Sequence, residues 1–274
     1  MGRSGGHALM ACLLLCLLTV PLGAGERMPF IAIIIDDLGN DLTEARRTAA
    51  LPGAITCAVL PHLPFSVAAA DLAHQQGKEV MLHLPMQADS GHDPGPGAIE
   101  VDLDEQETRL RVQQALASLP HVRGVNNHMG SRLSREYHHL AWVMSELRAQ
   151  GPDLYYVDSR THAQTLGYRV AAWAGIETTQ RDVFLDARPH DAAFAHMQLQ
   201  HLIHLARTRG HALAIGHPYP ATLQMLEDML PTLAARGIQL LPVSEYLKQK
   251  EELRQWHASL SPSPTVARKL KPSP

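Results

Sequence analysis

Cysteine and net charge are both scarce in this chain of 274 residues, and each shortage excludes a class of protein. Two of the three cysteines, Cys12 and Cys16, lie in an apolar N-terminal stretch, so removal of that stretch leaves Cys57 alone. A mature chain with one cysteine forms no intramolecular disulfide. Cys57 lies in an apolar run, which favours a buried structural thiol over a nucleophile. The net charge of -3, with histidine neutral, provides no basic surface for nucleic acid.

Several catalytic motifs are missing as well. The chain has no Gly-x-Ser-x-Gly sequence, no Walker-type phosphate loop and no dinucleotide-binding glycine pattern. Ser131 or Ser159 could act as a nucleophile only with a partner histidine, which the sequence does not identify. These absences disfavour serine hydrolases, nucleoside triphosphatases and dinucleotide-dependent enzymes.

The two ends of the chain differ in composition from its middle. Arg3 precedes an apolar stretch over residues 8–20, and Leu22-Gly23-Ala24 resembles a cleavage site, so we expect residues 1–24 to be a signal peptide. The apolar stretch is shorter than the ~20 residues of a membrane-spanning helix. We therefore expect export to the periplasm or the extracellular space, with no integral membrane span after cleavage; an uncleaved anchor is the alternative. Residues 259–274 are rich in proline, serine and lysine and are predicted to be disordered.

Apolar runs typical of buried strands alternate with helical patterns over residues 28–250. The first run, over residues 30–35, is rich in isoleucine and reads as a strand that is buried on both faces. The expected strands are 30–35, 55–60, 78–82, 122–127, 154–157, 182–186, 212–216 and 238–243. Alternation of this kind predicts an α/β protein with a parallel sheet. About seven strand–helix units are close to a (β/α) barrel, formed as one domain.

Polar side chains follow the apolar strands where each strand ends. They are Asp36, Asp37, His83, His128, Asp158 and His217. Because the carboxyl ends of the strands of a barrel meet at one mouth, we expect these residues to lie close together. Carboxylate and imidazole groups together suit zinc, and a catalytic zinc site keeps three protein ligands. A divalent metal of this kind lowers the pKa of its water to about 7 while a nearby carboxylate accepts the proton.

Each of these residues also has a structural interpretation. His83 could be a satisfied core histidine, and His217 could belong to a tight turn. One aspartate of the pair Asp36 and Asp37 could cap the helix that follows. Asp158 could bond a backbone amide or a histidine ring nitrogen, which would place it behind the metal ligands.

Six short motifs occur in a fixed order between residues 28 and 248. They are Ile35-Asp36-Asp37-Leu38-Gly39, His83-Leu84-Pro85-Met86, Gly124-Val125-Asn126-Asn127-His128-Met129-Gly130-Ser131, Asp158-Ser159-Arg160-Thr161, Arg181-Asp182-Val183-Phe184-Leu185-Asp186 and Ile215-Gly216-His217-Pro218. Together they resemble the divergent polysaccharide deacetylases, which are relatives of the carbohydrate esterases with the NodB-type fold.

The resemblance implies a distorted seven-stranded (β/α) barrel of the glycoside hydrolase/deacetylase type. It also implies metal-dependent removal of acetyl groups from N-acetylated sugars. Asp36 is then the general base and Asp37 a metal ligand. His83 matches the first histidine ligand, and His217 matches the general acid. For an exported protein, the expected partner is an N-acetylated glycan such as peptidoglycan.

The chain departs from the family pattern at two points. Gln87 stands four residues after His83, where the second histidine ligand should lie, and we infer that His128 from the next strand replaces it. The arginine that orients the base has no clear counterpart, and Asn126 or Asn127 lies near its place. The residues expected behind the ligands or against the substrate are Asn126, Asn127, Asp158, Ser159 and Asp186.

These observations are compatible with two functions from different classes. The first is an exported hydrolase with Asp36 as base, His217 as acid, and a divalent metal, expected to be zinc, on Asp37, His83 and His128. The second is a catalytically inactive glycan-binding or envelope-scaffold protein on the same fold, which the altered ligand pattern favours.

Overall fold

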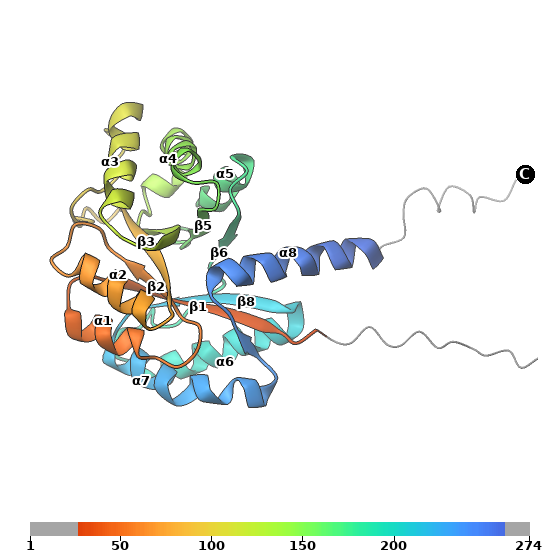
Figure 1. The fold of residues 1–274 in the computed structure, drawn as a ribbon. Helices are drawn as coiled ribbons and strands as arrows, with labels where there is room; N and C mark the ends of the chain where they lie inside the picture. The colour runs from red at the N-terminus through yellow and green to blue at the C-terminus, as the bar shows by residue number, and fades with distance from the viewer. Residues whose placement is uncertain (1–26, 261–274) are drawn as a thin grey trace, which may run out of the picture.

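The computed structural model describes residues 27–260, and its elements are arranged around strand β1, Phe30–Leu38 (Figure 1). Alternate side chains of β1 point to opposite faces of the sheet. Ile31, Ile33 and Ile35 belong to the larger hydrophobic core, which lies between the sheet and the helices. Phe30 and Ile34 belong to a smaller core on the other face. The isoleucine-rich run is thus buried on both faces, as predicted.

Strands and helices alternate along the chain. The elements are β1, α1 (Leu42–Ala49), β2 (Thr56–Val59), α2 (Ser66–Gln75), β3 (Glu79–Met86), α3 (Glu105–Ala117), β4 (Val122–Met129), α4 (Tyr137–Gln150), β5 (Tyr155–Asp158), α5 (Gly167–Trp173), β6 (Thr178–Gln180), β7 (Val183–Phe184), α6 (Ala192–Arg209), β8 (His211–Gly216), α7 (Pro220–Met229), β9 (Gln239–Leu240) and α8 (Val243–Leu260). Three short 3₁₀ helices cover Leu133–Arg135, Leu230–Thr232 and Ala234–Arg236.

The nine strands form one parallel sheet with the order β6-β5-β4-β3-β2-β1-β8-β7, and β9 pairs with β1. The prediction of a barrel-like parallel α/β fold is therefore confirmed, but the expected count of seven strands is wrong. Three of the strands have only two or three residues, and β6 is largely polar, so their sequences carry little strand signal. Within residues 27–260, no strand pairing joins β6 to β7, so the curved sheet is open.

Helix α8 lies across the open side of the sheet (Figure 1). Lys250 Nζ donates a hydrogen bond to Thr179 Oγ1 of β6 at 2.8 Å. The hydroxyl group of Tyr246 lies 2.8 Å from His211 Nδ1 of β8. Tyr246 also belongs to the smaller hydrophobic core, so α8 covers the inner face of β1 and its neighbours.

The ends of the chain are only partly described. The expected signal peptide, residues 1–24, lies outside the described residues, as do residues 261–274 of the expected disordered tail. The first two residues of that tail, Ser259 and Leu260, are instead the last residues of α8. Among residues 27–260, no helix has the length and apolarity needed to cross a bilayer. Cys57 is buried in β2, as predicted.

Candidate active site

The end of β1 places two carboxylates beside the neighbouring strands. Pairing of β1 with β2 shifts register between Ile35 and Leu38, and Asp37 has a left-handed backbone with a φ of 60°. Irregularities of this kind at the end of a strand redirect side chains. Asp36 is 3% exposed, whereas the side chain of Asp37 is 31% exposed. The two aspartates are thus held in different environments although they are adjacent in sequence.

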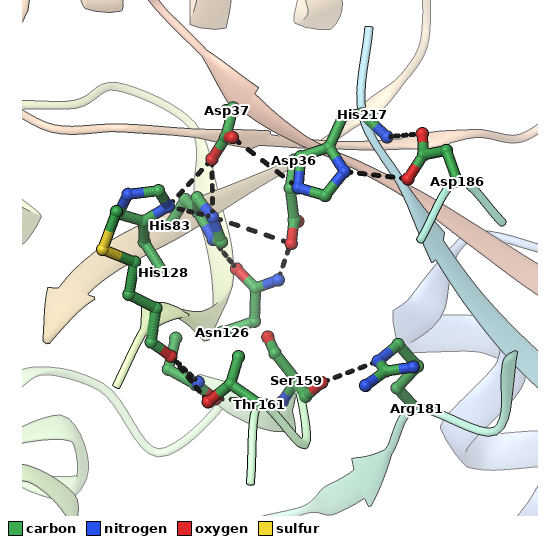
Figure 2. Close-up of polar contacts among 12 residues, drawn as sticks. Asp36, Asp37, His83, Asn126, His128, Ser159, Thr161, Arg181, Asp186 and His217 are labelled. Carbon is green, nitrogen blue, oxygen red and sulfur yellow. Dashed lines mark hydrogen bonds and ion pairs between the residues drawn. The ribbon is translucent and has the colours of Figure 1, made fainter. Parts of the chain in front are cut away.

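Three donor atoms from three strands converge at Asp37 (Figure 2). His83 Nε2, from β3, lies 3.1 Å from Asp37 Oδ1. His128 Nδ1, from β4, lies 2.8 Å from the same oxygen and 3.1 Å from His83 Nε2. Asp37 Oδ1 is buried and has no hydrogen bond of acceptable geometry, although both nitrogens are close. The three atoms form a compact triangle whose members all point to a shared centre.

The donor triangle fits a divalent metal ion. Zinc binds imidazole nitrogen and carboxylate oxygen at about 2.0–2.2 Å, so ligand atoms of a tetrahedral site are roughly 3.3 Å apart. The observed separations of 2.8–3.1 Å are slightly shorter than that. A cation would also give the orphaned oxygen of Asp37 a partner. The set of one carboxylate and two imidazoles matches divalent transition metals better than calcium or magnesium, which prefer oxygen ligands.

Asn126 connects a candidate ligand to the buried aspartate. Its Oδ1 lies 2.8 Å from His83 Nδ1, and its Nδ2 donates to Asp36 Oδ1 at 2.8 Å. When His83 Nδ1 carries the proton, Nε2 keeps a lone pair for a cation, so Asn126 selects the useful tautomer. The same amide fixes the direction of the Asp36 carboxylate. The sequence had placed Asn126 near the position of a missing orienting arginine.

His217 and Asp186 form a pair on the other side of the two aspartates. His217 Nδ1 lies 2.9 Å from Asp186 Oδ1, and His217 Nε2 lies 3.6 Å from Asp37 Oδ2. Asp186 Oδ2 accepts from the backbone amide of His217 at 2.6 Å and from Thr222 Oγ1 at 2.8 Å. Three hydrogen bonds therefore fix the carboxylate that orients the imidazole.

The surroundings displace the pKa values of these groups in different directions. Burial raises the pKa of Asp36. Burial also acts to raise the pKa of Asp37, but the close ring nitrogens of His128 and His83 outweigh it and lower that pKa. Burial acts to lower the pKa of His217, yet the hydrogen bond to Asp186 and the charges of nearby aspartates raise it to about 9. The site thus combines a carboxylate that holds a proton more readily with an imidazole that stays protonated at neutral pH.

A cavity of about 380 Å³ opens onto these groups. Its lining includes Asp36, His83, His128 and His217, together with residues that follow β5 and β6 and with Phe184 of β7. A second cavity, of about 230 Å³, lies on the other side of Asp37 and His128 and is bordered by the loop containing residues 93–96. His128 lines both cavities, whereas His83 borders only the first and Asp37 only the second.

The structure does not bring every predicted residue to this cavity. Asp158 accepts from Thr165 Oγ1 and from the Tyr168 amide, both at 2.9 Å, and so stabilises the turn before α5. Asn127 lines the cavity, but its side-chain oxygen accepts from the Ser159 amide at 2.9 Å. Ser159 lines the cavity, and its Oγ has no hydrogen-bond partner.

Gln87, which occupies the family position of a second histidine ligand, is turned away from the donor triangle. Its side-chain oxygen accepts from the Val101 amide at 2.9 Å. The loop after β3 is thereby fixed to the segment before α3. His128, from the strand next to β3, supplies the third donor in its place.

Comparison with known proteins agrees with this geometry. Residues 33–247 match the family described as divergent polysaccharide deacetylases. The chain belongs to that family. It is 33% identical over 243 residues to the uncharacterized protein YibQ of Escherichia coli K12, which covers 89% of this chain and 74% of that protein.

Solved structures share the fold of this chain. The uncharacterized protein ATU2773 of Agrobacterium tumefaciens C58 superposes with a TM-score of 0.76 and 23% identity, over 81% of this chain and 91% of that one. Two structures superpose with a TM-score of 0.50. The catalytic domain of a peptidoglycan N-acetylglucosamine deacetylase from Eubacterium rectale has 13% identity, over 78% and 88% of the two chains. A CE4 family pseudoenzyme from Bacillus anthracis, BA3943, has 12% identity, over 81% and 66%.

Three residues of the candidate site were not singled out from the sequence. Thr222 holds Asp186, while Arg181 and Phe184 line the cavity. Arg181 and Phe184 belong to the motif that ends in Asp186, so their position next to a strand end was the available signal. Thr222 lies within α7, where an apolar helix pattern gives no sign of a polar contact.

Proposed function

We propose that this chain is an exported, metal-dependent hydrolase that removes acetyl groups from an N-acetylated polysaccharide of the cell envelope. One observation carries the proposal: the donor triangle of Asp37, His83 and His128 lies next to a buried carboxylate, Asp36, and next to a protonated imidazole, His217. Hydrolysis of an amide needs a base for water, an acid for the leaving amine and stabilisation of the carbonyl oxygen.

A divalent cation held by the donor triangle would supply Lewis acidity toward the acetyl carbonyl oxygen and toward a water molecule. Asp36 accepts a proton from the attacking water while the oxygen of that water bonds to the acetyl carbon. Burial favours this step because it raises the pKa of Asp36 toward the working pH. Asn126 keeps the carboxylate oriented through its bond to Oδ1.

His217 completes the reaction by protonating the sugar nitrogen as the carbon–nitrogen bond breaks. Its pKa of about 9 keeps the imidazole protonated at neutral pH, and Asp186 keeps its Nε2 turned toward Asp37. The products are acetate and a free amino sugar. The base and the acid are a carboxylate and an imidazole in different environments, which separates the two proton-transfer roles.

Two observations support a polysaccharide substrate and an exported location. The family description names polysaccharide deacetylation, and the N-terminal sequence pattern predicts export. An exported protein of this family meets glycans of the cell envelope, of which peptidoglycan is N-acetylated. We propose zinc as the metal because two imidazoles and one carboxylate are its common ligands.

Metal content and acetate release from acetylated glycan test the proposal together. We expect near-stoichiometric zinc in the purified wild-type protein, and loss of both the metal and acetate release in His83→Ala and His128→Ala. His204→Ala, on the exposed face of α6, is the matched control and should keep both properties. Wild-type protein that binds no zinc after incubation with the ion would contradict the proposal.

A catalytically inactive glycan-binding or scaffold protein is the second candidate. The replacement of the usual histidine by Gln87, which is bonded to a loop, favours it. A fold neighbour from Bacillus anthracis is described as a pseudoenzyme, so the fold occurs without activity. An Asp36→Asn variant separates the two: full function in cells would support the binding protein, and loss of function with an intact fold would support the hydrolase.

A further inference from the structure

Arg181 borders the cavity that also contains the candidate base and acid, and its guanidinium group is held in a fixed orientation (Figure 2). Its Nε donates to the Ser159 carbonyl oxygen at 2.7 Å, and its Nη2 donates to the Arg160 carbonyl oxygen at 2.8 Å. Its Cζ lies 4.7 Å from the centre of the Phe184 ring. Two carbonyl contacts and one stacked ring define the plane of the guanidinium group before any ligand binds.

The guanidinium group of Arg181 is not in contact with any carboxylate of the described residues. Within residues 27–260, no carboxylate oxygen lies within 4.0 Å of its guanidinium nitrogens, and Nη1 makes no hydrogen bond. Other half-buried arginines do have such partners: Arg47 pairs with Glu227 at 2.7 Å, and Arg109 with Glu105 at 2.9 Å. A partly buried cation without a counter-ion is unfavourable unless something else supplies the negative charge.

Burial and the neighbouring Arg160 lower the pKa of Arg181, and the more distant carboxylates of Asp36 and Asp158 offset this only in part. A guanidinium group nevertheless keeps its charge at physiological pH, because its ordinary pKa is above 12. Two of its five N–H groups are used by the backbone carbonyls, which leaves three for a ligand. Arg160 is exposed at the same cavity and adds a second positive charge.

Ser159 provides an independent sign of a ligand in the same place. The residue is 5% exposed, its Oγ has no hydrogen-bond partner, and it lines the cavity. Its backbone amide is held by Asn127 Oδ1 at 2.9 Å, so the residue is fixed in position. A buried hydroxyl group without a partner is uncommon in a folded protein. The hydroxyl group of Ser159 and the remaining N–H groups of Arg181 are therefore donors without partners on one wall of the cavity.

We propose that Arg181 and Ser159 form a subsite for a carboxylate group, so that the preferred substrate is an acidic N-acetylated sugar. The inference rests on the proposed deacetylation, because the acetyl group would occupy the part of the cavity between Asp36 and His217. A guanidinium group of fixed plane recognises a carboxylate through paired, charge-assisted hydrogen bonds. A neutral sugar would leave the charge of Arg181 unpaired, which is an effective way to reject it.

The shape of the cavity agrees with this assignment. Its volume of about 380 Å³ lies within the range of small-molecule sites, roughly 300–1,000 Å³. Phe184 and Ile215 give it apolar surface on which the carbon face of a sugar ring can pack. Arg181 stacks on Phe184, so the carboxylate site and the apolar surface are adjacent.

Binding of two sugars that differ in a carboxylate tests the subsite directly. The probes are N-acetylmuramic acid and N-acetylglucosamine, measured by calorimetry on the full chain at constant ionic strength. We expect the wild-type protein to bind the acid at least about tenfold more tightly, as is typical of a charge-assisted contact. Arg181→Gln and Ser159→Ala should both reduce that preference.

Arg188→Gln is the matched control. Arg188 also stacks on a phenylalanine, with its Cζ 5.0 Å from the centre of the Phe194 ring, but it does not line the cavity. The preference for the acid should persist in this variant. Equal wild-type affinities for the two sugars, or a preference that Arg188→Gln removes as strongly as Arg181→Gln, would overturn the subsite.

The loop contacts of Arg181 call for a second variant, because Arg181→Gln also loses two bonds to backbone carbonyls. Ser159→Ala leaves those bonds in place, and thermal unfolding shows whether each variant is folded. An unchanged preference for the acid in folded Ser159→Ala and folded Arg181→Gln would overturn the inference.

Activity on neutral glycans separates this inference from the proposed function. Rapid deacetylation of a neutral N-acetylglucosamine oligomer, with no preference for the acid in binding, would overturn the subsite alone. A preference for the acid that depends on Arg181, with no deacetylation of either glycan by the zinc-loaded protein, would support the subsite and contradict the proposed hydrolase.

Discussion

His211 and His217 stand at the two ends of strand β8, and their pKa values are displaced in opposite directions. Burial and the positive charge of Lys250 lower the pKa of His211 to about 4. The hydrogen-bond partner of its Nδ1 is the neutral hydroxyl group of Tyr246. Burial also acts to lower the pKa of His217, but Asp186 and the neighbouring aspartates raise it to about 9.

The comparison shows that neighbours, and not the strand itself, decide what each histidine can do. The amino end of β8 is covered by α8, which contributes Tyr246 and Lys250. The carboxyl end meets the strand ends that carry Asp36, Asp37 and Asp186. One end is therefore a structural contact with a neutral imidazole, and the other is a reactive edge with a protonated one.

The largest effect should come from replacing His217, with the replacement of His211 as the comparison. We expect His217→Gln to lower kcat for acetate release by roughly 10²–10⁴-fold, because the leaving amine loses its proton donor. Zinc content should be unchanged, since His217 is not part of the donor triangle. His211→Gln should leave kcat unchanged. Equal losses of kcat in the two variants would contradict the division between the two ends.

The pKa difference itself can be reduced by changing one carboxylate. In the metal-free protein, Asp186→Asn should lower the pKa of His217 from about 9 toward its ordinary value of 6.5, because a charged partner is lost. NMR titration of the imidazole ring protons measures the pKa of His217 in each variant. Asp182→Asn removes an aspartate near His211 instead and should leave the pKa of His217 in place. A pKa near 6.5 for His217 in the metal-free wild-type protein would contradict the proposed effect of the aspartates at the carboxyl end of β8.

The smallest effect should be on stability in acid. A histidine whose pKa is lowered to about 4 by folding stabilises the folded state above pH 6.5, and this contribution is lost as pH falls from 6.5 toward 4. Because His211 is partly exposed, we expect about 1 kcal/mol.

His211→Asn should therefore reduce the loss of unfolding free energy between pH 7 and pH 4.5, as measured by urea denaturation. His204→Ala, on the exposed face of α6, is the control and should follow the wild-type curve. An identical acid dependence in His211→Asn and wild type would show that His211 carries no such linkage.

The alternation of strands and helices could be predicted from the sequence alone, and so could the polar residues that follow several of the strands. Buried strands are recognisable because apolar side chains must fill both faces of a parallel sheet, and Phe30–Leu38 shows this clearly. Asp36, Asp37, His83, His128 and His217 could be grouped because strand ends converge at one edge of such a sheet. The resemblance of short motifs added the family, which the match over residues 33–247 confirmed.

Which of these polar residues face the cavity could not be predicted without the three-dimensional structure. Asp158 and Gln87 had the sequence positions of site residues, yet both are bonded to nearby loops. Arg181 became a candidate only when its missing carboxylate partner could be seen. Strands of two or three residues, such as β7, form because longer neighbours provide their hydrogen bonds. Side-chain direction and pairing depend on contacts between residues far apart in the chain, and no local pattern records those contacts.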